Sequence, residues 1–340
     1  MKLLITGGAG FIGSNFVHYW VKKHPKDKIV VLDKLTYAGN LENLIDLEKN
    51  KNFTFVKGDI VNVKLVDQLF SKEKFDLVVH FAAETHVDRS LLNSANFIKT
   101  NFLGTQVLLE TSLRHKIKHF HHVSTDEVFG AIGENEHWKF TEKTPYNPRN
   151  PYSASKAAAD HLVRSYYISL GLPVTITNCS NNYGPYLFPE KLISLAITNL
   201  IEDKPVPIYG SGKQSRDWLY VEDHCRAIEM VILKGKKGET YCVGGMNKEI
   251  TNLEVIQKIC KIMRKDFKSS VVHVKDRPGH DFKYVVEWKK INKELGWSPK
   301  YKFEDWLKKT VEWYENNHLW WQNIKKGSYK TYYKKQYKKL

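Results

Sequence analysis

A chain of 340 residues is long enough to bury a large hydrophobic core and to form about two domains. Its apolar fraction of 42% and charged fraction of 26% are ordinary for a globular protein, and no apolar run reaches the ~18 residues that a membrane-spanning helix needs. The formal net charge of +16 would suit a nucleic-acid partner, but only eight of the 53 basic residues are arginines and the lysines are spread along the chain. We therefore expect no nucleic-acid partner and no membrane partner, with RNA contact by the lysine- and tyrosine-rich tail after Lys325 as the alternative.

The cysteines and histidines give no pattern typical of a metal site. The four cysteines are scattered, with no CxxC pair and no histidine at ligand spacing, which fits a protein of the reducing cytoplasm and argues against a disulfide framework. His119, His121 and His122 lie at the end of a predicted strand without a carboxylate ligand pattern. We expect a surface or core-edge role for these histidines and no metal.

The first half of the chain alternates short apolar strands with helical patterns. Strands are predicted at 2–6, 28–33, 53–57, 76–81, 119–124 and 174–178, and helices at 11–23, 93–114 and 152–170. Strands that are apolar throughout and alternate with helices indicate a parallel sheet that is covered on both faces. The predicted fold class is therefore α/β, with a Rossmann-type doubly wound parallel sheet.

Beyond residue 181 the pattern loosens, with prolines and glycines at short intervals. We expect residues 1–178 to form the first domain, with a segment near 216–240 returning to its sheet. Residues 179–340 are expected to form mainly a smaller mixed α/β domain that binds the substrate. Tryptophans gather near the C-terminus, where they are predicted to fill a small core and one packing face of a helix.

A glycine-rich turn lies between the first strand and the first helix. Gly7, Gly10 and Gly13 are spaced by three, and Gly8 with the last two also matches GxGxxG. Such glycines let the backbone approach a pyrophosphate, while the helix N-terminus supplies a partial positive charge. Asp33, twenty residues after Gly13 at the end of the second strand, would bind both adenosine-ribose hydroxyls and repel a 2′-phosphate. The chain is therefore predicted to bind NAD rather than NADP.

Further candidate cofactor residues follow the neighbouring strands. Asp59, after the third strand, would suit the adenine amino group, and Phe81-Ala82-Ala83, after the fourth, would let the cofactor lie against the backbone. The other predicted cofactor contacts are Phe11, Ile12, Lys34, Leu35, Thr36, Ile60, Thr85, Thr100, Tyr152 and Lys156.

Five residues form the predicted catalytic set. Tyr152 precedes Lys156 by four residues on a helix, so both side chains share one face, and the lysine charge would lower the tyrosine pKa toward neutrality. Thr125, in the run Ser124 to Glu127 at the end of the fifth strand, would hold the hydroxyl that is oxidised. Adjacent Asp126 and Glu127 go beyond that need, because a base at one carbon and an acid at its neighbour is what loss of water requires.

These motifs together extend over nearly the whole chain. The matching stretches are 6–13, 82–90, 124–128, 151–156, 177–185, 216–223 and 276–281. On them the chain resembles the nucleotide-sugar 4,6-dehydratases of the extended short-chain dehydrogenase/reductase superfamily. Phe129 departs from the family pattern, which usually has tyrosine there.

The resemblance implies an NAD-dependent lyase that converts dTDP-glucose to dTDP-4-keto-6-deoxyglucose. Tyr152, assisted by Lys156, would take the O4 proton while C4 passes its hydride to NAD⁺, and Thr125 would hydrogen-bond the C4 oxygen. Glu127 would then remove the C5 proton while Asp126 protonates the departing O6 hydroxyl. The hydride would return to C6, so no second substrate is needed.

The resemblance also implies a substrate pocket and an assembly. Arg216 and Arg277 lie inside specific motifs and would bind the diphosphate, with surface salt bridges as the alternative. The other implied substrate contacts are Thr85, Thr125, Asn178, Lys191, Leu192, Pro207, Tyr209, Asn252 and His280. A homodimer is expected through helices 93–114 and 152–170.

Other functions stay open from the sequence. A 4-epimerase shares the glycine turn and the Tyr152–Lys156 pair but has no use for Asp126 and Glu127. A UDP-glucose 4,6-dehydratase is harder to separate, although residues 208–210 and 216–218 favour the dTDP sugar. From a different class, the chain could be a catalytically idle NAD-binding sensor or an RNA-binding protein.

Overall fold

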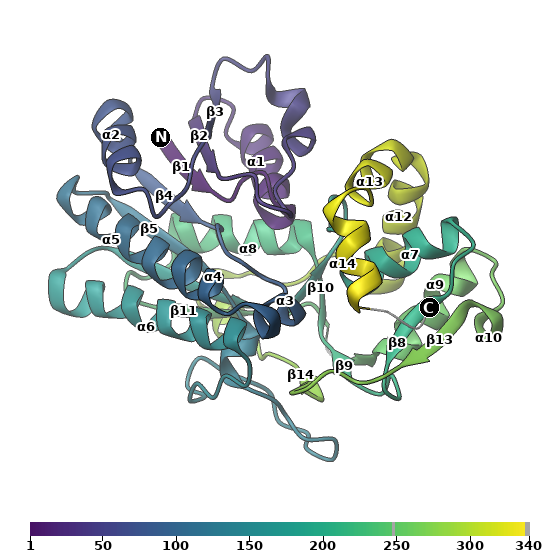
Figure 1. The fold of residues 1–340 in the computed structure, drawn as a ribbon. Helices are drawn as coiled ribbons and strands as arrows, with labels where there is room; N and C mark the ends of the chain where they lie inside the picture. The colour runs from purple at the N-terminus through teal and green to yellow at the C-terminus, as the bar shows by residue number, and fades with distance from the viewer. Residues whose placement is uncertain (247–248, 337–340) are drawn as a thin grey trace.

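A seven-stranded parallel sheet forms the centre of the larger lobe in this computed structural model, which describes residues 1–246 and 249–336 (Figure 1). Its strand order is β11-β6-β5-β4-β1-β2-β3. The strands are β1 (Lys2–Thr6), β2 (Lys28–Asp33), β3 (Phe53–Lys57), β4 (Leu77–His80), β5 (His119–Thr125), β6 (Val174–Cys179) and β11 (Thr240–Val243). In the register, Leu4 of β1 lies opposite Val30 on one side and Val78 on the other. The order therefore reverses between β1 and β4, where a crevice opens in sheets of this kind.

Helices cover both faces of this sheet. One face carries α1 (Phe11–Lys23) and α8 (Val221–Lys234), and the other carries α2 (Val63–Glu73), α5 (Gly104–Arg114) and α6 (Pro151–Leu170). Trp20 and Ile228 fill the first layer, and Phe70 and Val163 fill the second; all four are fully buried. This two-layer burial confirms the predicted doubly wound α/β class.

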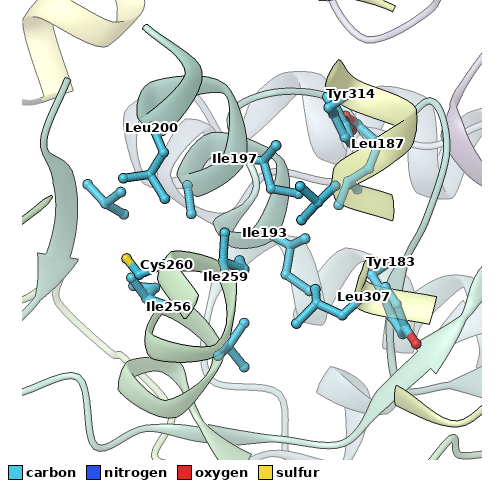
Figure 2. Packing of buried hydrophobic residues seen from close by; sticks show 14 of the residues in the cluster. Tyr183, Leu187, Ile193, Ile197, Leu200, Ile256, Ile259, Cys260, Leu307 and Tyr314 are labelled. Carbon is cyan, nitrogen blue, oxygen red and sulfur yellow. The ribbon is translucent and has the colours of Figure 1, made fainter. Parts of the chain in front are cut away.

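The smaller lobe is built from the second half of the chain (Figure 1). Its helices are α7 (Leu192–Ile201), α9 (Asn252–Ile262), α10 (Phe267–Ser270), α12 (Phe303–Asn316), α13 (His318–Ile324) and α14 (Ser328–Gln336), and β8 (Val206–Tyr209) pairs with β13 (Val271–Val274). Figure 2 shows Ile197 of α7, Ile259 of α9 and Leu307 of α12 meeting in its core. The C-terminal tryptophans pack in and beside this lobe, as expected. Trp320 and Trp321 lie in its hydrophobic core, and Trp297 is fully buried in a separate hydrophobic cluster with Leu219 and Tyr241.

Several further elements are short. These are α3 (Val87–Leu92), α4 (Ala95–Phe97), α11 (Lys289–Leu295), β7 (Asn181–Tyr183), β9 (Ser215–Arg216), β10 (Trp218–Tyr220), β12 (Ile250–Thr251), β14 (Lys283–Tyr284), and 3-10 turns at Leu41–Leu47 and Asp126–Phe129. β9 pairs with β12 and β14, which brings together three distant parts of the chain. This small sheet carries Arg216 to the junction of the lobes.

The predicted strands and helices of the first half are confirmed with one clear exception. The helix predicted over 93–114 is wrong at its start and in its regularity, since Asn93 ends α3 and a π-helical turn (Ile98–Leu103) separates α4 from α5. Asn101 in that wide turn is fully buried, and its side chain bonds the backbone N–H and carbonyl of Glu84 and the Ser155 hydroxyl. These tertiary hydrogen bonds are the physical reason for the irregular turn. No strand was predicted at β11, which directly follows the segment near 216–240 that was expected to return to the sheet.

The expectation of a surface or core-edge role for His119, His121 and His122 is wrong. All three are buried, because β5 lies in the middle of the sheet between β4 and β6. Thr175 of β6 accepts or donates hydrogen bonds at 2.8 Å with the rings of His119 and His121. Thr175 of the neighbouring strand thus bonds two of the three rings, and the ring of His122 faces Lys156 and Asp160 of α6.

The C-terminal tail packs on the smaller lobe through α14. The Tyr329 hydroxyl donates to the Pro189 carbonyl at 2.8 Å, and the Gln336 amide donates to the Tyr209 hydroxyl at 2.7 Å. Residues 337–340 of the lysine- and tyrosine-rich tail lie outside the described residues. Within the described part of the chain, none of the helices combines the length and apolar character needed to cross a bilayer.

Candidate active site

A cavity of about 400 Å³ runs from the carboxyl ends of the parallel strands into the smaller lobe. All but two of the residues predicted to bind cofactor or substrate, or to act in catalysis, line it. The two exceptions are Leu35, whose backbone N–H donates to Asp33, and Asn178, which is fully buried beneath the wall. The structure therefore brings the separate motifs of the sequence into one site.

The glycine turn is shaped to let a ligand lie against backbone. Gly7 has φ +71°, and a Cβ on it would stand 2.5 Å from the backbone nitrogen of Ala82. A Cβ on Gly13 would stand 2.2 Å from the Gly7 carbonyl oxygen. Gly10 caps the N-terminus of α1, whose first turn holds no acidic residue. This cradle fits the pyrophosphate of a dinucleotide at the positive end of the helix.

Asp33, the last residue of β2, is held in place beside the glycine turn. One carboxylate oxygen accepts from the Ala9 N–H at 3.0 Å and the other from the Leu35 N–H at 2.8 Å. Burial raises the pKa of this carboxyl, while the two backbone hydrogen bonds oppose the rise. Neighbouring Lys34 pairs with Asp59 at 2.8 Å and is therefore engaged with another carboxylate. A fixed acid at this place fits the ribose of NAD.

The N-terminus of α6 positions the tyrosine and lysine. Asn150 caps the helix in a capping box with Ser153, and Pro151 occupies the first turn. Lys156 is buried, and its ammonium group donates to the Val123 carbonyl at 2.9 Å. It also lies 3.3 Å from Nε2 of His122.

The expected lowering of the Tyr152 pKa by Lys156 is not what this arrangement shows. Burial and the negative charge of Glu127 raise the phenol pKa well above its ordinary value, and a hydrogen bond with Thr125 opposes them. Lys156 is instead held by the Val123 carbonyl of β5. The sequence spacing correctly predicted a shared helix face but not the electrostatic balance at the phenol.

Asp126 and Glu127 lie in different electrostatic environments although they are adjacent. Burial, together with the charges of Glu127 and Asp217, raises the Asp126 pKa well above its ordinary value. Burial also raises the Glu127 pKa, but the cations Arg277, Lys191 and Arg216 oppose that rise. Negative neighbours thus reinforce the rise at Asp126, whereas cations oppose the rise at Glu127, a difference suited to an acid at Asp126 and a base at Glu127.

Three cations gather where the cavity enters the smaller lobe. Arg216 is buried and donates to the backbone carbonyls of Ser215, Phe282 and Asp281. Its buried position disfavours the surface salt-bridge alternative for Arg216. Arg277 lies 3.6 Å from Asp88, and Lys191 donates to the Thr85 carbonyl at 3.1 Å. The geometry concentrates positive charge suited to a diphosphate.

Several residues of the site were missed from the sequence. Asp88 accepts from the Tyr209 hydroxyl at 3.1 Å and faces Arg277. Asp217 is fully buried, and burial raises its pKa to about 7. Asp160, four residues after Lys156 on α6, is also fully buried, and this i,i+4 spacing is a signal that could have found it. The described residues contain no group of three or more potential ligand side chains for a metal.

Comparisons with known proteins agree with this geometry. The family described as GDP-mannose 4,6 dehydratase matches residues 4–310. A dTDP-glucose 4,6-dehydratase of Xanthomonas campestris pv. campestris is 52% identical over 344 residues, covering 96% of this chain and 97% of the relative.

Solved structures are similar over nearly the whole chain. The dTDP-glucose 4,6-dehydratase of Streptomyces venezuelae, solved with NAD and TYD bound, has a TM-score of 0.92 and 44% identity, covering 95% of this chain and 100% of that one. The Bacillus anthracis enzyme of the same name, in complex with NAD, has a TM-score of 0.89 and 45% identity, covering 95% and 99%. With the shared fold and the assembled dehydratase motifs, these matches show that the chain belongs to the nucleotide-sugar 4,6-dehydratase family.

Proposed function

We propose that this protein is an NAD-dependent lyase that dehydrates dTDP-glucose to dTDP-4-keto-6-deoxyglucose. The observation that carries the proposal is the placement of Asp126 and Glu127 in the same cavity as Tyr152, Lys156 and the glycine turn. An oxidoreductase or epimerase needs the tyrosine, the lysine and the cofactor cradle, but not a second acid–base pair. Only a reaction that also eliminates water uses all of these groups.

The glycine turn and Asp33 would hold NAD, which would supply an acceptor for the C4 hydride and a donor for its return to C6. The phenolate form of Tyr152 receives the O4 proton and becomes the neutral phenol, and Lys156 lies one turn along α6 on the same buried face. Thr125 holds the C4 oxygen. These three residues carry the oxidation that makes the C5 hydrogen acidic.

Elimination follows at the adjacent carboxyls. Glu127, whose negative charge Arg277 and Lys191 favour, takes the C5 proton. Asp126, whose pKa is raised by burial and by neighbouring negative charge, gives its proton to the departing O6 hydroxyl. Glu127 then returns a proton to C5.

Substrate binding is assigned to the smaller lobe. We propose that residues 1–178 bind NAD and that residues 179–340 mainly bind the nucleotide sugar. Arg216, Arg277 and Lys191 would neutralise the diphosphate, and the other substrate residues of the cavity would line the sugar and base, with Asn178 buried behind the wall. The presence of these side chains along one cavity supports this division of labour.

The reaction can be tested with two sugars. The purified protein should convert dTDP-glucose to a 4-keto-6-deoxy product at a higher kcat/KM than UDP-glucose. Preference for UDP-glucose would reassign the nucleotide, and release of a 4-epimer without loss of water would replace dehydration by epimerisation.

Cofactor choice gives a second prediction. Asp33→Ala should weaken NAD binding and reduce the ratio of the affinities for NAD and NADP. The ribose hydroxyls lose their acceptor, and the 2′-phosphate of NADP is no longer repelled by a carboxylate. Titration of the two cofactors by fluorescence would measure both affinities, with exposed Asp46→Ala as a matched control. Equal affinity of the unmodified protein for the two cofactors would contradict the assignment.

We also propose a homodimer formed through α5 and α6. The two helices pack together on one face of the sheet, and Leu103, Ile168 and Leu170 beside or within them are exposed. A second copy placed there would bury these side chains in a four-helix arrangement. Sedimentation at micromolar concentration should show a dimer, and Ile168→Lys should shift it toward monomer. A strict monomer before mutation would refute the proposal.

The compartment proposed is the cytoplasm. All four cysteines are free thiols in buried positions, as is usual where thiols stay reduced.

A further inference from the structure

A buried carboxylate on α6 connects residues that the proposed mechanism uses separately. Asp160 has no solvent exposure. One of its oxygens, Oδ2, accepts hydrogen bonds from the Ser124 hydroxyl at 2.8 Å, the Tyr146 hydroxyl at 2.9 Å and the Asn178 amide at 3.1 Å. A buried charge is costly unless it is paired and hydrogen-bonded, so three donors on one oxygen mark a constructed site.

Two of these donors fix the end of β5. Ser124 directly precedes Thr125, and the Asn178 amide that reaches Asp160 also donates to the Thr125 carbonyl at 3.0 Å. The backbone of the residue that holds the C4 oxygen is thus tied to the Asp160 carboxylate. This contact also gives Asn178 a place beneath the cavity wall rather than against the substrate.

The other oxygen faces the catalytic lysine through a histidine. Oδ1 of Asp160 lies 3.2 Å from Nε2 of His122, and the same nitrogen lies 3.3 Å from the Lys156 ammonium group. Burial and the Lys156 charge lower the His122 pKa to about 4, so the ring is neutral near pH 7. A neutral ring therefore stands between a buried cation and a buried anion.

We propose that Asp160 is a positioning residue whose negative charge holds Lys156 as a cation and whose hydrogen bonds align Thr125. The inference rests on the proposed function, since it assigns Asp160 a part in the oxidation at C4. The titratable groups around Lys156 are Tyr152 one turn earlier on α6, His80 of β4, His122 of β5, Cys179 of β6 and Asp160 itself.

Asp160 is the one carboxylate among those surrounding groups. Burial lowers the pKa of both histidines and raises that of the Cys179 thiol, so all three are neutral near pH 7. Burial lowers the Lys156 pKa, and the charge of Asp160 opposes that change. Loss of the carboxylate should therefore let Lys156 deprotonate at a lower pH.

Asp160→Asn tests this charge with little change in shape. The amide oxygen can keep the three hydrogen bonds at the Oδ2 position, while its NH₂ group can donate to His122 in the tautomer whose Nε2 is unprotonated. The rate of cofactor reduction in a single turnover should fall. The alkaline limb of its pH–rate profile should also move to lower pH by about one unit or more, the scale of a lost nearby opposite charge. Rapid-mixing absorbance with dTDP-glucose across pH would measure both effects.

Tyr146→Phe is the matched control. It removes one hydrogen bond to Asp160 but keeps the charge, and Tyr146 does not line the cavity. It should leave the alkaline limb in place. The proposal is overturned if Asp160→Asn also leaves the limb in place, or if both variants lose rate equally at every pH together with thermal stability. Failure of the unmodified protein to form a 4-keto product would instead remove the proposed function.

Discussion

Glu127→Gln and Asp126→Asn should each retain substrate binding and cofactor reduction but fail at loss of water. Oxidation at C4 depends on Tyr152 and Lys156, whereas elimination needs a base for the C5 proton and an acid for the O6 hydroxyl. An amide can serve as neither, so each variant should lose ~10²-fold or more in the elimination step, the scale of a lost general acid or base. Single-turnover absorbance would follow the reduced cofactor, which should accumulate because the hydride has no acceptor at C6.

Isotope exchange separates the two variants. Glu127→Gln should stop exchange of the C5 hydrogen with solvent deuterium, and Asp126→Asn should slow water loss while C5 exchange continues. Glu134→Gln, an exposed acid in the following loop, controls for removal of a charge. Normal C5 exchange or normal elimination in Glu127→Gln would exclude Glu127 as the base. The proposed dehydratase function would then be replaced by that of an oxidoreductase or epimerase.

Tyr152→Phe should block the reaction one step earlier. Without the phenol no group takes the O4 proton, so hydride should not leave C4 and the cofactor should stay oxidised. The first hydride transfer should fall by ~10²-fold or more. Substrate affinity should change little, because the ring remains packed against Val87 and Phe97. The measurement is the same single-turnover absorbance together with a binding titration.

The control for this variant is again Tyr146→Phe, a partly buried tyrosine outside the cavity. It loses a hydroxyl of the same kind but should reduce the cofactor at nearly the normal rate. Cofactor reduction by Tyr152→Phe at the rate of the unmodified protein would show that another group is the base. Comparison with Glu127→Gln would then identify whether one carboxylate serves both steps.

The sequence by itself determined the features that depend on neighbours along the chain. The spacing of Gly7, Gly10 and Gly13 between a strand and a helix predicted the cradle, because a tight turn and a helix N-terminus are local structures. The spacing of Tyr152 and Lys156 predicted a shared face, since residues four apart on a helix lie together. Apolar strands that alternate with helices predicted the covered parallel sheet for the same reason.

Only the tertiary structure decided properties that depend on burial and on contacts between distant segments. The raised pKa of Asp126 comes from burial and from charges that include Asp217, a residue between β9 and β10 and far from Asp126 in the sequence. The histidines of β5 are core residues because β4 and β6 lie on either side of that strand, which composition does not reveal. The raised pKa of Tyr152 and the place of Asp160 follow in the same way. Electrostatic roles therefore came from the folded environment, while residue types and spacings had already indicated the chemistry.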